Sequence, residues 1–86
     1  MKILGILIEE RIKEKIFDKH AIDAEEIEQI MLSNPFILKS KEQRYMAIGY
    51  YKRYITIIFE MIQNSAFIIT AYPSSEAQKA LWKRKK

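Results

Sequence analysis

The residues of this chain best suited to chemistry are one histidine and a few cations close to aromatic side chains. His20 is the single histidine, and an imidazole can serve as either a general acid or a general base near neutral pH. Arg44 and Arg53 each begin an apolar and aromatic stretch, and a guanidinium group can hold an anion through two parallel hydrogen bonds. Lys52 adds a point charge beside Arg53, and Tyr72 adds a phenol that can stack or donate a proton. These residue types suit acid–base chemistry on an anionic partner.

The charge pattern separates an acidic segment from several basic ones. The chain has 86 residues and a formal net charge of +4, and residues 23–28 carry only acidic charges. This asymmetry suggests an anionic partner at the basic surface, but charge alone favours the simpler interpretation, a solvated surface with a basic tail. Most of the cations lie at Lys39, Lys41, Arg44, Lys52, Arg53, Lys79 and residues 83–86.

Composition excludes several classes of site and protein. The chain has no cysteine and one histidine, so disulfides, thiolate zinc sites and multi-histidine metal sites are excluded. No phosphate-binding loop, dinucleotide fingerprint or nucleophile elbow is present. No apolar run reaches the roughly 20 residues of a membrane span. We therefore expect a soluble cytoplasmic protein of one domain, residues 1–86, with no metal, no cofactor and no membrane partner.

A β-meander is predicted between residues 44 and 72, and the rest of the chain is expected to pack on it. Stretches 44–50, 53–62 and 66–72 are rich in Ile, Thr, Tyr and Phe and are separated by short polar breaks. Residues 35–41 add a fourth strand. Alternation in the second stretch predicts one face made of Ile55, Ile57, Phe59 and Met61.

Helical patterns flank the predicted sheet. Residues 9–20 have isoleucines at four-residue spacing. Asp23 and Glu26 form a capping-box pattern at the start of a second helix, which Asn34-Pro35 ends. A last helix is expected after Pro73 with a serine cap, with Ala77, Ala80 and Leu81 facing the sheet and Trp82 covering one edge. Residues 2–8 suit either an edge strand or a lead-in to the first helix.

The predicted fold class is α+β. The order is (β)ααββββα, with a largely antiparallel sheet of four to five strands packed by two N-terminal helices and one C-terminal helix. We expect all of these helices to cover one side of the sheet.

Several strings resemble segments of the BrnT-like toxins, a family within the RelE-like superfamily. Residues 19–28, KHAIDAEEIE, resemble the family segment KHG(V/I)xxEE(A/V)E. Residues 44–49, RYMAIG, and 53–59, RYITIIF, resemble the RYxAIG and R(Y/L)LxVV(F/H) strands. Asn34-Pro35 stands where those proteins have Asn-Pro or Asp-Pro, and residues 68–71, IITA, resemble the segment xI(S/T)A.

Family members are typically toxins of type II toxin–antitoxin pairs that cleave RNA without a metal and are neutralised by a cognate antitoxin. The resemblance implies a RelE-like fold, metal-independent endoribonuclease activity, and RNA and a cognate antitoxin as partners. Two residues depart from the family pattern: Ala21 replaces the Gly after the histidine, and Tyr72 replaces the Arg that usually follows the SA or TA pair. The loss of this Arg favours the alternative function, a catalytically degenerate RelE-like binding module that keeps only a partner or nucleic-acid surface.

Cleavage of this kind needs a base near the attacking 2′-OH, cations on the phosphate and an acid at the leaving oxygen. We expect the guanidinium groups and the imidazole to face one shared concave side. We predict catalytic roles for His20, Arg44, Arg53 and Tyr72, and RNA contacts for Lys19, Lys52, Tyr54 and Lys79.

Each of these residues also has a structural interpretation. His20, near a helix end, can cap carbonyl groups. Arg44 and Arg53 can be edge charges that discourage aggregation. Tyr54 and the neighbouring tyrosines can pack across strands instead of stacking on bases. A neutralising partner would cover the basic face or extend the sheet by strand addition, and the sequence selects neither mode.

Overall fold

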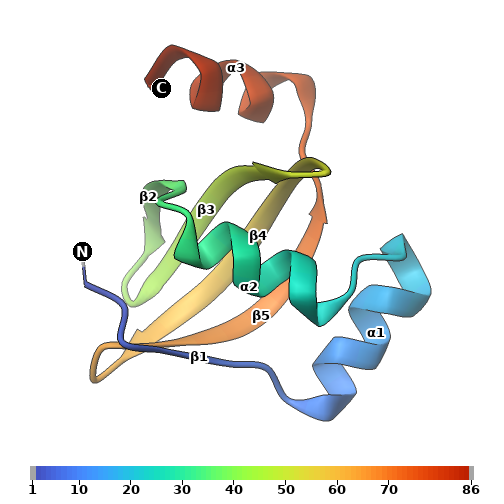
Figure 1. The fold of residues 1–86 in the computed structure, drawn as a ribbon. Coiled ribbons are helices and arrows are strands. Elements are labelled where there is room, and N and C mark those ends of the chain that lie inside the picture. Colours follow the sequence, from blue (N-terminus) through green and yellow to red (C-terminus); the bar gives the residue numbers. More distant parts are fainter. Residues whose placement is uncertain (1, 86) are drawn as a thin grey trace.

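The computed structural model describes residues 2–85; Met1 and Lys86, at the ends of the apolar opening segment and the basic tail, lie outside the described residues. Within residues 2–85, three helices pack on a five-stranded sheet of order β1-β5-β4-β3-β2 (Figure 1). This confirms the predicted α+β class and element order. The elements are β1 Gly5–Leu7, α1 Glu10–His20, α2 Ala24–Leu32, β2 Phe36–Lys41, β3 Arg44–Tyr51, β4 Arg53–Ile62, β5 Ser65–Pro73 and α3 Glu76–Lys85.

Strands β2 to β5 form the predicted antiparallel meander. Two of its three turns use backbone conformations with positive φ. Lys52 alone connects β3 to β4, with φ of 69°. Gln63 and Asn64 connect β4 to β5 with φ of 50° and 70°, the pattern of a type I′ hairpin turn.

The first two helices cover one face of the sheet, which we call the inner face. The β4 residues Ile55, Ile57 and Phe59 are all fully buried there, as the alternation predicts. Ile27 and Ile30 of α2 are also buried in this core. Gly49 of β3 allows α2 to approach closely, because a Cβ at this position would lie 2.6 Å from Ile30 Cγ2.

The junction between α1 and α2 is defined by backbone conformation and by a cap. Ala21, which follows α1, has φ of 56° and ψ of 35°, the left-handed conformation that usually favours glycine. The predicted capping box of α2 is confirmed: Asp23 accepts from the Glu26 backbone N–H, and the Glu26 carboxylate accepts from the Asp23 N–H. The junction is therefore short and fixed at both helix ends.

Helix α3 packs on the opposite face, which we call the outer face, so the expectation that all helices share one side is wrong. Its Gln78 contacts Thr56, which alternates with the inner-face residues of β4. The expected contact face of α3 is also partly wrong, because Ala77 and Ala80 are exposed. Gln78 and Trp82 contact the sheet instead. Two alanines bury too little apolar area to set the orientation of a helix.

The opening segment forms an edge strand, one of the two predicted alternatives. β1 pairs in parallel with the first residues of β5, Gly5 with Ser65 and Leu7 with Phe67. Beyond Phe67, the pairing of β5 with β4 shifts at Ile69, an irregularity of the β-bulge type. Within residues 2–85, no helix is long and apolar enough to cross a membrane.

Candidate functional site

Arg53 is held by the helices of the inner face. Its Nε and Nη2 atoms each donate to the Glu26 carboxylate at 3.0 Å, and Nη2 also donates to the Ala21 carbonyl. Glu26 is 5% exposed. The hydrogen bond from Arg53 lowers the pKa of Glu26, and the same bond raises the pKa of Arg53. The guanidinium group therefore ties the α1–α2 junction to the start of β4.

Arg44 lies at the other end of the sheet and on the other face, so the expected shared concave side is wrong. It pairs with Glu60 across the β3–β4 ladder, with its Nε 3.9 Å from Glu60 Oε2. Arg53 and Glu60 are an odd number of positions apart on β4, so their side chains point to opposite faces. The two guanidinium groups cannot act on one phosphate.

A polar network joins α3 to the outer face. The buried Thr56 hydroxyl donates to Gln78 Oε1 at 2.9 Å, so the Ser74 hydroxyl, 2.8 Å away, donates to Thr56. Gln78 Nε2 in turn donates to the Tyr72 hydroxyl oxygen at 3.2 Å. Tyr72 thus keeps its own proton for a second hydrogen bond.

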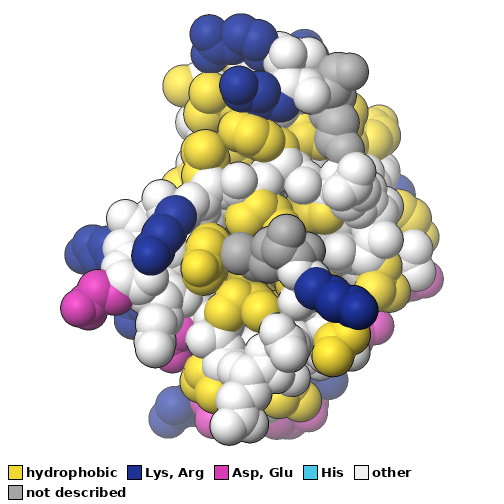
Figure 2. All heavy atoms as spheres, turned by 90° about the vertical axis from the view of Figure 1, so that its left-hand side faces the viewer, with side chains coloured by type: hydrophobic (Ala, Val, Ile, Leu, Met, Phe, Trp, Pro, Cys, Tyr) yellow, Lys and Arg dark blue, Asp and Glu magenta, His cyan; other side chains and the backbone are white. Residues whose placement is uncertain are grey.

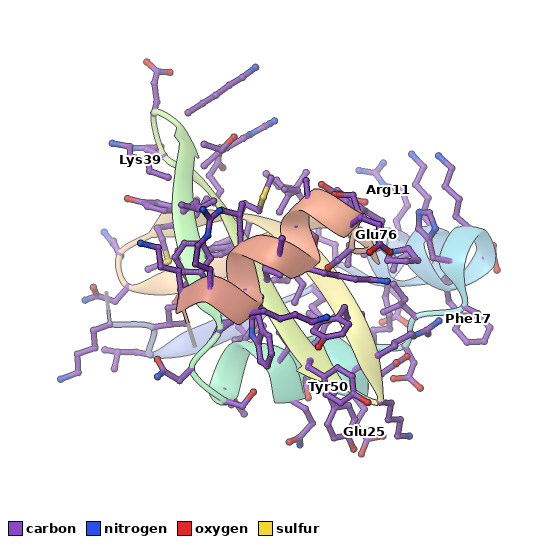
Figure 3. All side chains as sticks on the ribbon, turned by 90° about the horizontal axis from the view of Figure 1, so that it is seen from above. Arg11, Phe17, Glu25, Lys39, Tyr50 and Glu76 are labelled. Carbon is purple, nitrogen blue, oxygen red and sulfur yellow. The ribbon has the colours of Figure 1, made fainter. Side chains whose placement is uncertain are left out.

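Aromatic rings and lysines gather where α3 crosses the sheet. The Tyr54 ring makes edge contacts with Tyr50 and Trp82, with centroids 4.9 and 5.4 Å apart. The amines of Lys79 and Lys83 lie 5.8 and 5.6 Å from the centre of the Tyr54 ring. We call these five residues the aromatic–cation cluster. Figure 2 shows Lys and Arg side chains gathered over α3 at the top of the molecule, and Figure 3 shows α3 crossing over the strands.

His20 and Lys19 line a hollow between α1 and β5. The hollow has a volume of about 180 Å³ and is walled on the strand side by Ile69 and Thr70. Lys15 completes its cationic side, one helical turn before Lys19. We call this space the His20 hollow. The end of α1 is capped by the backbone, because the Ala21 N–H donates to the Phe17 carbonyl.

The predicted site residues therefore fall into separate groups. Tyr54, Lys79 and Tyr72 come together around α3, and Lys19 and His20 come together in the hollow. Arg53 lies beside the end of α1, next to the His20 hollow, but is bound to Glu26. Arg44 is remote from both groups. Lys52 lies at a turn, with its amine 5.5 Å from the Tyr51 ring centre.

Some contributing residues were missed from the sequence. Gln78 stands three positions after Ser75, and the two form a reciprocal cap: Ser75 N–H donates to Gln78 Oε1, and Gln78 N–H donates to Ser75 Oγ. The S-x-x-Q pattern is a capping-box signal that could have found Gln78. Trp82 was predicted to cover one edge and Lys83 was counted with the basic tail, but neither was predicted as a site residue. Among the described residues, no group of three or more His, Asp or Glu side chains is arranged to hold a metal ion.

Comparison with known proteins connects this arrangement to a family. No family model matches the chain, and no curated protein matches it. Among solved structures, the crystal structure of the Brucella abortus ribonuclease toxin BrnT matches with a TM-score of 0.71 and 25% sequence identity. The match covers 84% of this chain and 97% of that chain. The chain is therefore similar in fold to the BrnT ribonuclease toxin.

The BrnT-like match confirms the resemblance predicted from the sequence strings. Because it covers nearly all of BrnT, the likeness includes the complete arrangement of that protein and not one shared supersecondary unit. Two features of this chain are candidate sites: the His20 hollow beside β5, and the outer face with the aromatic–cation cluster.

Proposed function

We propose that this protein is the toxin component of a type II toxin–antitoxin system and cleaves RNA in the cytoplasm without a metal ion. The observation that carries the proposal is the match to the ribonuclease toxin BrnT over 97% of that chain. The basic and aromatic character of the outer face around α3 supports an RNA partner, since ring faces stack on bases and lysines neutralise phosphates.

The path proposed for RNA runs from the aromatic–cation cluster to the His20 hollow. Tyr54, opposite Tyr50, lies next to the Thr56–Tyr72 pair on the β4–β5 ladder. Tyr72 and Thr70 lie two positions apart on β5, a separation of about 7 Å. Thr70 also lines the His20 hollow. A single strand laid along this line would place one base near Tyr54 and a phosphate near Lys19 and His20.

The chemistry proposed at the His20 hollow is transesterification within the RNA. The 2′-OH attacks the adjacent phosphorus, the 5′ oxygen leaves, and a 2′,3′-cyclic phosphate results. His20 takes the proton of the 2′-OH, Lys19 neutralises charge on the phosphate, and solvent water protonates the leaving 5′ oxygen. Tyr72, which lies in the group around α3, contacts the neighbouring nucleotide instead. Arg53 is given a positioning role, because its guanidinium is bonded to Glu26 and Ala21 beside His20.

A second candidate function is a binding module that has lost catalysis. Two observations favour it: Tyr72 stands at the position where family members usually have Arg, and both Arg44 and Arg53 are paired with carboxylates. Such a module would bind RNA or a protein partner and would not cleave RNA.

Incubation of the purified protein with a labelled single-stranded RNA in excess EDTA distinguishes the two candidates. Cleavage that ends in a cyclic phosphate, with a rate reduced about 10²-fold or more in His20→Ala, is expected for the nuclease. Phe17→Ala is the matched control, because Phe17 is exposed on the same helix and points away from α3 (Figure 3). Binding without cleavage would support the binding module.

A cognate antitoxin protein is the second proposed partner. Expression of the chain alone should inhibit growth, and co-expression of the adjacent reading frame should relieve the inhibition. The observation that would contradict this part is undiminished toxicity in the presence of every neighbouring gene product.

A further inference from the structure

Two adjoining hollows between α1 and β5 form a groove. The His20 hollow forms one part of it. The other part is a hollow of about 490 Å³ lined mainly by apolar side chains, among them Leu7, Phe67 and Ile69. Ile12 and Ile69 line both hollows, so the two spaces adjoin. We call the whole the α1–β5 groove.

The groove lies along a part of β5 that has lost its neighbouring strand. β1 pairs with β5 only as far as Leu7 and Phe67. In the described part of the chain, no strand pairs beyond Phe67 with the edge of β5 that faces away from β4. Leu7 is 50% exposed and Phe67 is 36% exposed, so large apolar side chains face solvent where the strand pairing stops. An unpaired strand edge with apolar neighbours is a docking site for an extended segment.

Charge differs between the two ends of the groove. Lys15, Lys19 and His20 line one end, and Glu9 lines the apolar end. Both lysines are exposed, so their charges are available to a ligand. An acidic side chain is therefore attracted to the lysine end, and a nucleic-acid backbone is disfavoured along the apolar end because its phosphates would lie beside Glu9 without a cation.

We propose that the α1–β5 groove binds an extended segment of a protein partner in which apolar side chains adjoin acidic ones. The apolar side chains fill the hollow beside Leu7 and Phe67, and the acidic ones reach Lys15 and Lys19. This inference does not require the chain to cleave RNA. If the chain does cleave RNA, the same segment covers the His20 hollow and inhibits cleavage.

The test is the binding of fluorescein-labelled synthetic peptides of about ten residues, followed by fluorescence anisotropy. One peptide carries alternating Leu and Ile followed by Glu residues, a second carries the same residues in reverse order, and a third has Lys in place of Glu. We expect one of the Glu peptides to bind with a dissociation constant in about the micromolar range, and the Lys peptide to bind at least about tenfold more weakly.

Matched variants locate the binding. Leu7→Asp and Lys19→Glu should each weaken binding about tenfold or more. Leu4→Asp changes an apolar residue of the same opening segment that is 69% exposed and lines neither hollow, and Lys39→Glu changes an exposed lysine on β2. Both controls should bind as the unchanged protein does, and circular dichroism should show all four variants folded.

The proposal is overturned if neither Glu peptide binds, if the Lys peptide binds equally well, or if the controls weaken binding as much as the groove variants do. A homodimer in sedimentation equilibrium that Leu7→Asp dissociates would assign the groove to a second copy of the chain and overturn the proposal. The RNA-cleavage assay with His20→Ala is read separately, so failure of the nuclease leaves this result interpretable.

Discussion

Arg53 binds the Glu26 carboxylate through two nitrogens, each 3.0 Å from a different carboxylate oxygen. The pair joins the start of β4 to the first turn of α2, and a third bond reaches the carbonyl of Ala21. The same carboxylate that caps α2 therefore also binds the sheet. Bidentate, charge-assisted pairs of this kind give fixed geometry as well as energy. Together with the bond to Ala21, the pair therefore holds the end of α1, where His20 lies, beside the start of β4.

Removal of this guanidinium should destabilise the fold. Arg53→Met leaves the buried Glu26 carboxylate without its main partner, and we expect a loss of about 1.5–3 kcal/mol in the free energy of unfolding. Urea denaturation measures it. Arg44→Met is the control, because Arg44 is half exposed and 3.9 Å from Glu60, and its loss should cost at most about 1 kcal/mol. Equal losses in the two variants would show that the Glu26 pair has no special role.

The same pair predicts how stability depends on pH. The pKa of Glu26 is lowered in the folded state, chiefly by the Arg53 hydrogen bond. Between the lower folded pKa and the ordinary glutamate value of about 4.3, the unfolded chain binds more protons, so acid favours unfolding. The stabilisation is present above that ordinary value and is lost as the pH falls through the folded pKa. Thermal melts at pH values from neutral to acidic should show a smaller acid-induced fall for Glu26→Gln than for the unchanged protein.

Ala21 offers a stabilising substitution. Its φ of 56° is costly for a residue with a Cβ, and Ala21→Gly should raise the free energy of unfolding by about 1 kcal/mol. Ala24→Gly is the opposite control, because Ala24 begins α2 and a helical glycine costs about 0.5–1 kcal/mol. Thermal denaturation compares the two. A decrease for both variants would contradict the left-handed assignment.

Gly49→Ala should be destabilising through crowding and not through backbone strain. The added Cβ would lie 2.6 Å from Ile30 Cγ2 and 3.5 Å from Pro35 Cβ, and overpacking of this kind costs about 1–3 kcal/mol. The two effects should not add: in an Ile30→Ala background, which removes Cγ2, Gly49→Ala should lose most of its cost. Additive losses in the double variant would place the crowding elsewhere.

Tyr54→Ala should weaken binding of single-stranded RNA. The loss of one stacked base is worth about 1–3 kcal/mol, or roughly fivefold to a hundredfold in affinity. Filter binding at fixed salt measures it. Tyr45→Phe is the control, because Tyr45 packs against the buried Phe59 on the inner face and should leave RNA affinity unchanged. Equal affinities for Tyr54→Ala and the unchanged protein would remove the aromatic–cation cluster from the proposed RNA path.

Features set by neighbouring residues were predictable from the sequence. The Asp23–Glu26 cap needs only residues three positions apart, and the burial of Ile55, Ile57 and Phe59 needs only the period of a strand. The same alternation places Arg53 and Glu60 on opposite faces of the sheet. Because Arg44 pairs with Glu60, Arg44 and Arg53 also lie on opposite faces. The expected shared side could therefore have been rejected by counting positions along β4.

Features set by tertiary contacts were not predictable in this way. Arg53 and Glu26 are 27 positions apart, and no local pattern pairs them. The orientation of α3 was wrongly predicted because apolar residues were expected to face the sheet, whereas Gln78 makes the contact through hydrogen bonds to Thr56 and Tyr72. The His20 hollow likewise depends on where α1 lies against β5, which periodicity alone does not determine.

The parallel pairing of β1 with β5 has a consequence for synthesis on the ribosome. Gly5 emerges first and its partner Ser65 emerges late, so the N-terminal strand must wait for most of the chain to be translated. During that interval Ile3, Ile6 and Ile8, which pack against the finished core, remain exposed to water. The nascent chain therefore passes through a stage in which this segment is open to chaperones and to other nascent chains, and this stage ends only when the last hairpin forms.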